Sequence, residues 1–143
     1  MKCARELIEM KQEAINTWET AKQENIMALG TAAIEFCEKI GKELEEKAQA
    51  RQPLEYFVKL DTTTNKYGHE VARTLVKDSY GYADGTASYH ATSDGEFSFE
   101  VMQDYFKMHC IETKVSDSCY ARYGWGSLSC KLLRVYVPAN LKC

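Results

Sequence analysis

Histidine and cysteine are the side chains of this chain that are best suited to acid–base, nucleophilic or metal chemistry. The three histidines, His69, His90 and His109, lie far apart in the sequence. A general base must reach a substrate proton and be held in place by neighbouring groups. His90 has a polar loop and Asp94 close behind it, but such a neighbour is common on polar surfaces. We therefore predict that the chain has no catalytic residue and is not an enzyme.

The spacing of the cysteines does not predict a metal site. Zinc ligands usually come in pairs separated by a few residues. The closest pair here is His109 and Cys110, which are adjacent and would point about 100° apart on a helix. A nucleotide-binding loop is not predicted either, because Ser129 stands where the third glycine after Gly124 and Gly126 would be needed. We expect no metal and no cofactor.

The start of the chain favours a reducing compartment. Residues 1–6 run straight into charged side chains and lack the apolar stretch of a secretory signal. We therefore expect a cytoplasmic protein. In that compartment the six cysteines would act as small buried thiols. The alternative is a secreted protein, in which this even number of cysteines could pair as disulfides.

Composition is that of an ordinary globular protein. The chain has 143 residues, of which 45% are hydrophobic and 27% charged, which is enough to build a core without disulfides. The formal net charge of −3 disfavours direct binding to nucleic acid or to an anionic membrane. No apolar run approaches the roughly eighteen residues of a membrane-spanning helix.

Residues 1–52 form one predicted helical segment, which Pro53 ends. Apolar residues recur with the 3.6-residue period of a straight α-helix at Ala4, Ile8, Ile15, Trp18, Ile26, Leu29, Ala33, Phe36, Ile40 and Leu44. Such a helix would be about 70 Å long, whereas the rest of the chain forms a body only roughly 30 Å across.

Two arrangements would cover the spare length of this helix. A break near Gly30 would give an antiparallel helix pair, since a glycine can end one helix before the next begins. An unbroken helix would instead pack its first half against another subunit. We favour the unbroken helix and a homodimer, with an interface formed by Ile8, Ile15, Trp18, Ile26 and Leu29.

Residues 53–143 are predicted to form a compact α+β domain. The two-residue period of Leu54–Leu60 predicts a strand, followed by a polar turn at residues 61–65 and a short helix over residues 69–77. A hairpin arm is expected at residues 87–90 and a helix over residues 99–109, with Ser98 as its N-cap. The last part is a predicted hairpin of residues 111–122 and 128–137, which places Val115 opposite Val135 and Thr113 opposite Val137.

The order of these predicted elements over residues 31–137 resembles that of the winged-helix family. This likeness implies an alternative function, that of a dimeric nucleic-acid-binding regulator. It departs from the family in the long separation between its second and third helices. The third helix, residues 99–109, carries Glu100 and Asp104 against Lys107, and this charge argues against DNA binding through it.

One tract stands out by its charge and its aromatic content. Residues 78–106 contain six acidic and seven aromatic residues and no lysine or arginine. Aromatic side chains supply rigid contact area and acidic ones select a basic partner. We predict a protein-binding surface here, formed by Tyr80, Tyr82, Asp84, Tyr89, Asp94 and Glu96. The alternative is that the aromatic residues cover the core and the acidic residues are only solvated.

Two segments resemble small accessory proteins of bacterial phages and prophages. They are the charged helix of residues 35–48, EFCEKIGKELEEKA, and the tyrosine- and glycine-rich region of residues 80–137. That class includes inhibitors of host defence systems such as anti-CRISPR proteins. The resemblance implies a phage-type inhibitor that occludes a basic surface on its partner.

Overall fold

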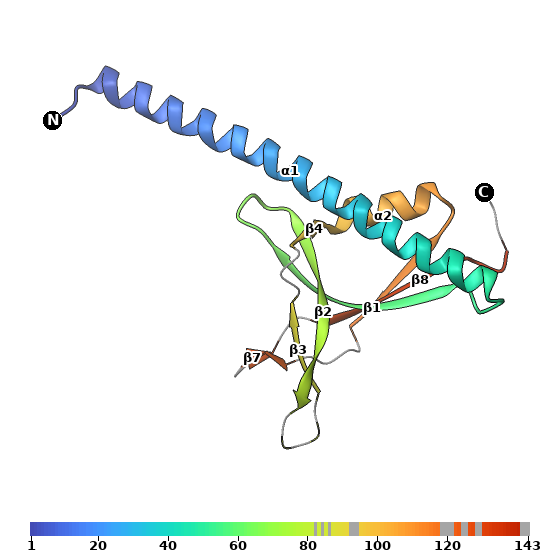
Figure 1. The fold of residues 1–143 in the computed structure, drawn as a ribbon. Coiled ribbons are helices and arrows are strands. Elements are labelled where there is room, and N and C mark those ends of the chain that lie inside the picture. Colours follow the sequence, from blue (N-terminus) through green and yellow to red (C-terminus); the bar gives the residue numbers. More distant parts are fainter. Residues whose placement is uncertain are drawn as a thin grey trace.

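The computed structural model describes residues 1–81, 83, 85, 87–91, 95–117, 122–123, 126–127 and 130–140. It has the predicted α+β class. A long N-terminal helix, α1, and a short helix, α2, cover one face of an antiparallel sheet of six strands (Figure 1). No helix in the described part of the chain has the length and apolar character needed to cross a membrane.

Helix α1 runs unbroken from Ala4 to Gln49, so the prediction of a continuous helix is confirmed. Gly30 stays within the helix, and a Cβ there would lie 4.0 Å from the Val101 side chain. The helix ends with Arg51 in the left-handed region (φ 57°). The Arg51 N–H donates to the Ala48 carbonyl and the Gln52 N–H to the Lys47 carbonyl, so the last carbonyls are satisfied before Pro53.

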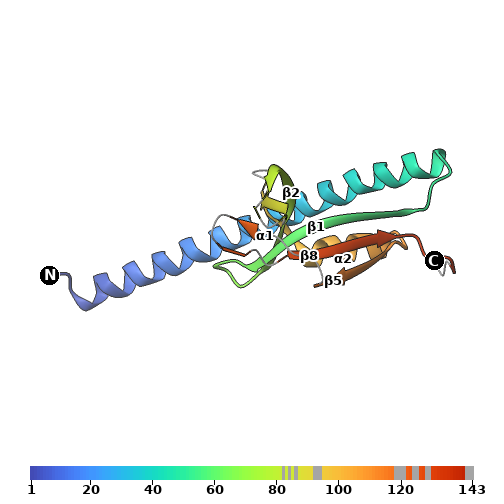
Figure 2. The ribbon, with the colours of Figure 1, turned by 90° about the horizontal axis from the view of Figure 1, so that it is seen from below.

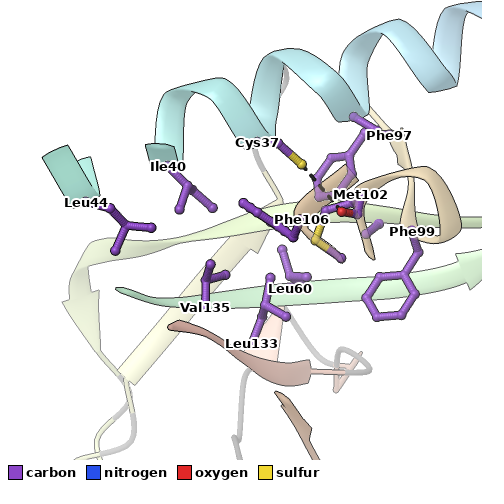
Figure 3. Close-up of a cluster of buried hydrophobic side chains, with 12 residues drawn as sticks. Cys37, Ile40, Leu44, Leu60, Phe97, Phe99, Met102, Phe106, Leu133 and Val135 are labelled. Carbon is purple, nitrogen blue, oxygen red and sulfur yellow. Dashed lines mark hydrogen bonds between the residues drawn. The ribbon is translucent and has the colours of Figure 1, made fainter. Parts of the chain in front are cut away.

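Only the C-terminal half of α1 belongs to the core. Its buried side chains are those of Leu29, Ala33, Cys37, Ile40 and Leu44. Cys37, Ile40 and Leu44 lie in one cluster with residues of α2 and of the sheet (Figure 3). Residues 1–20 are all exposed. Figures 1 and 2 both show this N-terminal part extending clear of the sheet.

Helix α2 spans Phe99–Met108 and is capped as predicted, with the Ser98 hydroxyl accepting from the Val101 N–H at 3.2 Å. It buries Phe99, Met102 and Phe106 between α1 and the sheet. The opposite face of the helix is exposed and carries Glu100 and Asp104.

The strands of the large sheet follow the order β3-β2-β1-β8-β5, with β4 paired to β2, and every pairing is antiparallel. The bounds are Glu55–Thr64 for β1, Glu70–Gly81 for β2, Ala87–Ala91 for β3, Phe97–Ser98 for β4, Glu112–Ser116 for β5 and Cys130–Tyr136 for β8. A separate ladder joins β6, Arg122–Tyr123, to β7, Gly126–Ser127. The hairpin arm expected at residues 87–90 is therefore confirmed as β3.

The predicted helix over residues 69–77 is wrong, because this segment belongs to β2. Val71 and Ala72 are both fully buried although they point to opposite faces. A strand buried on both faces shows no alternation, and its apolar run can then be mistaken for helical spacing. Without this helix, the order of elements departs from that of the winged-helix family.

The polar turn predicted at residues 61–65 starts later than expected, since β1 continues to Thr64. Asp61 pairs with Arg73 across the strands, and the chain reverses after Asn65. The Asn65 side-chain oxygen accepts from the backbone N–H groups of Tyr67 and His69, both at 3.0 Å. Gly68 follows with φ 82°, a conformation that glycine adopts without strain.

The C-terminal hairpin has a register two residues away from the predicted one. Thr113 pairs with Val135 and Val115 with Leu133. Because side chains alternate between faces with a period of two, this shift leaves Val135 facing the core as expected.

The expectation that all cysteines are free thiols is wrong for two of them. Cys110 and Cys130 are each disulfide-bonded. Cys3 and Cys37 are free, and Cys37 is the buried thiol that the sequence predicts.

Candidate partner-binding surface

The structure describes three of the predicted partner-binding residues, Tyr80, Tyr89 and Glu96. Tyr80 near the end of β2 has 69% of its surface exposed, and Glu96 is exposed just before β4. Tyr89 on β3 is partly buried, and its hydroxyl accepts a 2.5 Å hydrogen bond from the Lys59 ammonium. Tyr82, Asp84 and Asp94 lie outside the described residues.

Asp78, the first acidic residue of the tract, is engaged inside the protein. The Ser88 hydroxyl donates to one of its carboxylate oxygens at 2.6 Å, and His90 Nδ1 contacts the other. The Ser88 bond and the His90 contact outweigh desolvation and lower the pKa of Asp78 below its usual value. Asp78 is therefore not available to a basic partner.

This cluster also defines the environment of His90. Its partner is Asp78 on the neighbouring strand β2, and the contact arises from strand pairing rather than from closeness in sequence. The Ser88 hydroxyl bonds to the carboxylate and not to the imidazole, whereas an activated serine needs a base within hydrogen-bond reach. The cluster therefore has the geometry of a structural contact between β2 and β3.

A different set of acidic residues surrounds a hollow of about 550 Å³ between α1, the start of β2 and α2. Ile26, Leu29 and Val101 provide its apolar lining, and Glu70, Glu100 and Asp104 its carboxylates. Glu100 and Asp104 are four residues apart on α2, which places them on one face of the helix. No lysine or arginine is among the described residues that line this hollow.

The polar groups of this hollow have spare binding capacity. Glu70 lies 3.9 Å from the Lys131 ammonium, a long ion pair. Glu100 and Asp104 form no ion pair with any residue that the structure describes. His69 Nδ1 is buried and has no hydrogen-bond partner within the same part of the chain. Carboxylates above an apolar floor match a lysine or arginine side chain, which joins an apolar stem to a charged end.

A second hollow, of about 420 Å³, lies between α1 and strands β1 and β2. Its lining is mainly apolar and includes Phe36 and Phe97, whose rings stack with centroids 4.3 Å apart. Glu35, Lys39 and Glu43 of α1 add charges of both signs. Because the lining carries charges of both signs, it favours neither an anionic nor a cationic ligand.

The predicted dimer-interface residues differ in how much of their surface is exposed to solvent. Ile8 and Ile15 are exposed on the projecting part of α1, at 69% and 44%. Trp18 packs on Tyr67 of the β1–β2 turn with ring centroids 4.7 Å apart. Leu29 is buried against the chain's own body.

The sequence did not indicate that Glu70, Glu100 and Asp104 would come together. The four-residue spacing of Glu100 and Asp104 on a predicted helix indicates that they share one face of that helix. Glu70 could not be placed because its segment was predicted to be helical. Within the described part of the chain, no group of three or more potential ligands is arranged to hold a metal ion.

Comparison with known proteins gives no matching family model, no similar curated protein and no similar solved structure.

Proposed function

We propose that this chain is a non-enzymatic protein-binding module that engages a basic surface on its partner. The observation that carries the proposal is the hollow lined by Glu70, Glu100 and Asp104. Two of these carboxylates have no ion pair among the described residues, and an apolar floor lies beside them. We call Glu70, Glu100 and Asp104 the acidic site.

The chemistry of the acidic site favours an arginine or lysine side chain of the partner. The aliphatic stem would lie against Ile26, Leu29 and Val101, and the charged end would meet the carboxylates. The exposed Glu96, just before β4, would extend this contact, whereas Tyr80 lies near the other end of β2 from Glu70.

Binding of an oligo-arginine peptide, followed by fluorescence anisotropy at low and high salt, tests the proposal. The double variant Glu100→Lys/Asp104→Lys should lose binding. Its matched control is Glu45→Lys/Glu46→Lys, which makes the same change in net charge at exposed positions near the C-terminal end of α1. Equal loss in both variants would show that only net charge matters and would refute a defined site.

A triple variant, Asp84→Lys/Asp94→Lys/Glu96→Lys, tests the tract that is predicted from the sequence. If this triple variant loses binding of the peptide and the Glu100→Lys/Asp104→Lys variant keeps it, the contact lies outside the acidic site. Binding that survives in both variants would refute the role of the whole tract.

More specifically, we propose that the chain is a phage-type inhibitor or accessory protein. This proposal rests on the resemblance of residues 35–48 and 80–137 to small accessory proteins of phages and prophages. In this role the chain would cover a basic surface that its partner needs for binding nucleic acid. Competition supplies the test: the chain should displace nucleic acid from such a partner, and the Glu100→Lys/Asp104→Lys variant should not.

The cellular location is a separate proposal. The sequence favours the cytoplasm, whereas the disulfide-bonded Cys110 and Cys130 favour an oxidising compartment, because disulfides are rare where thiols are kept reduced. Alkylation of the protein directly in lysed cells, followed by mass spectrometry of the Cys110 and Cys130 peptides, distinguishes the two. Alkylated peptides would support the cytoplasm, and unmodified peptides would support an oxidising compartment.

We also propose that the chain forms a homodimer through the projecting part of α1. The support is the exposure of large apolar side chains there, including Leu7, Ile8, Met10 and Ile15. Sedimentation of the full chain over a range of concentrations tests this. A monomer at every concentration would refute it.

A further inference from the structure

The large sheet has two edge strands, β3 and β5, and they differ in regularity. β3 pairs with β2 through a register that shifts between Lys77 and Gly81, and it also contacts β6. β5 pairs with β8 over its whole length without a bulge, and no described strand pairs with its other side. Figure 2 shows β5 at the margin of the sheet. β5 is therefore the edge to which a further strand can add.

The outer side of the β5 backbone is available for pairing. In an antiparallel ladder, alternate residues direct their N–H and C=O groups toward the neighbouring strand, and the others direct them away. The groups directed away from β8 form no backbone hydrogen bond to another described segment. Edge strands are usually blunted by proline, a bulge or charged side chains. β5 has no proline and no bulge, so its charged residues, Glu112 and Lys114, determine which strand it accepts.

Lys114 lacks a carboxylate partner within the described part of the chain. It is exposed on the sheet face opposite the helices, and its cross-strand neighbour on β8 is Arg134. The Arg134 guanidinium is bound by Glu55 of β1 at 2.9 Å, whereas Lys114 forms no ion pair with any described residue. Like charges opposite each other on a sheet are destabilising. A strand added outside β5 is therefore favoured when it places an acidic residue opposite Lys114.

A second copy of β5 supplies that acidic residue. In an antiparallel pair centred on Thr113, Glu112 of each copy lies opposite Lys114 of the other, and this contact is made twice. On the face that the helices cover, the same register sets Ile111 of each copy opposite Val115 of the other. Both of these side chains are partly buried and pack against the core cluster, so the pairing extends the apolar layer from one copy to the next.

Other ways of pairing two β5 strands match the charges less well. Moving the centre to Lys114 sets lysine against lysine, and moving it to Glu112 sets glutamate against glutamate. A parallel pair in register makes both of these contacts. Centring the pair on Val115 sets Lys114 opposite Ser116 and leaves Glu112 beyond the end of the other β5 strand. Among these arrangements, the register centred on Thr113 is the one that pairs both charged side chains with opposite charges.

We propose that two copies of the chain join edge to edge through β5, antiparallel and centred on Thr113, to form one continuous sheet. This interface is separate from the proposed pairing through α1, whose projecting part lies away from β5 (Figure 2). Because opposite residues share a face, the helices of both copies cover the same side of the joined sheet. Both acidic sites then lie on that side and can engage one partner together, a consequence that rests on the proposed function.

A charge-exchange experiment tests the register. Glu112→Lys and Lys114→Glu are each placed in an Ile8→Glu/Ile15→Glu background, in which the exposed part of α1 is unable to pair. Each exchange should raise the dimer dissociation constant measured by sedimentation on the order of tenfold, because it makes both cross-strand contacts repulsive. An equimolar mixture of the two variants should restore the constant to within about threefold, since every lysine then lies opposite a glutamate.

Glu45→Lys and Lys42→Glu are the matched controls. They make the same changes in net charge at exposed positions of α1, and they should leave the dissociation constant unchanged. Restoration in the mixture also shows that both exchanged variants are folded. A mixture that does not restore the dimer, single exchanges without effect, or a background chain that is monomeric at every concentration would each overturn the pairing. Binding of the oligo-arginine peptide is measured separately, so this proposal and the proposed function can fail independently.

Amide hydrogen exchange gives a second readout, one that contacts between side chains alone do not change. The N–H groups of β5 that point away from β8 exchange readily in the monomer and should become protected at concentrations where the dimer forms. The amides of β3, at the other edge of the sheet, should exchange at the same rate in both states. Protection of β3 rather than β5 would overturn the proposal.

Discussion

The free thiol of Cys37 should be almost inert in the folded chain. Cys37 is 2% exposed and lies on the buried face of α1, where its thiol donates to the Met102 carbonyl at 3.6 Å. Burial, helped by the nearby charge of Glu38, raises the pKa of the Cys37 thiol from 9.0 to about 12.

The raised pKa of the Cys37 thiol determines how much more slowly it is alkylated in the folded chain. The thiolate is the reactive form, and at pH 8 about one thiol in ten is ionised at a pKa of 9, but only about one in ten thousand at a pKa of 12. We therefore expect alkylation of Cys37 in the folded chain to be roughly a thousandfold slower than in the unfolded chain. Steric protection by the surrounding core would slow the reaction further.

The assay is timed labelling with iodoacetamide, followed by mass spectrometry of the Cys37 peptide in native buffer and in denaturant. The Cys37→Ala variant shows which mass-spectrometric signal comes from the labelled Cys37 peptide. The labelling rate of the exposed Cys3 provides an internal comparison in the same sample. The native rate should still rise tenfold per pH unit between pH 9 and pH 10. A rate that levels off near pH 9, or one within tenfold of the unfolded rate, would refute the reasoning.

Three further predictions follow from local geometry. Gly41→Ala, in the interior of α1 with no atom within 4 Å of the new Cβ, should stabilise the fold by about 0.5–1 kcal/mol. Gly68→Ala should destabilise it by about 1–2 kcal/mol, because its φ of 82° strains any residue with a Cβ. Urea denaturation checks both, and the same sign for the two variants would contradict the argument. The bonds from Ser88 and His90 lower the pKa of Asp78 from 3.8, so its contribution to stability is present above about pH 4 and lost as the pH falls through the lowered value. Asp78→Asn should remove this part of the acid sensitivity in unfolding curves recorded from pH 6 to pH 2, and an unchanged pH profile would count against the assignment.

The sequence predicted well wherever the signal is local. The period of α1, the stop at Pro53, the capping hydroxyl of Ser98 and the alternation of Tyr56, Val58 and Leu60 each depend on residues close together in the chain. The same local signals failed at β2, because Val71 and Ala72 near its start are buried on opposite faces and the alternation is lost there. Its identity is decided by pairing with β1, β3 and β4, which no local window contains.

The acidic site likewise combines features that can be predicted from the sequence with features that only the structure shows. The excess of acidic residues between Lys77 and Lys107 is readable in the sequence, and Glu100 and Asp104 belong to it. The sequence could not show that Asp78 is engaged by Ser88 and His90, or that Glu70 lies beside α2. Those relations depend on the strand register and on the packing of α2 against α1.

The sequence by itself determined a long amphipathic helix, an α+β domain and a tract without basic residues, since composition and periodicity are properties of neighbouring residues. Only the tertiary structure decided which of the acidic residues remain unpaired and how much of α1 packs against the rest of the chain. Both depend on contacts between segments far apart in the chain, such as Trp18 with Tyr67 and Asp78 with His90. Such contacts form when the chain buries its apolar surface, and they leave no signal in the spacing of the residues that make them.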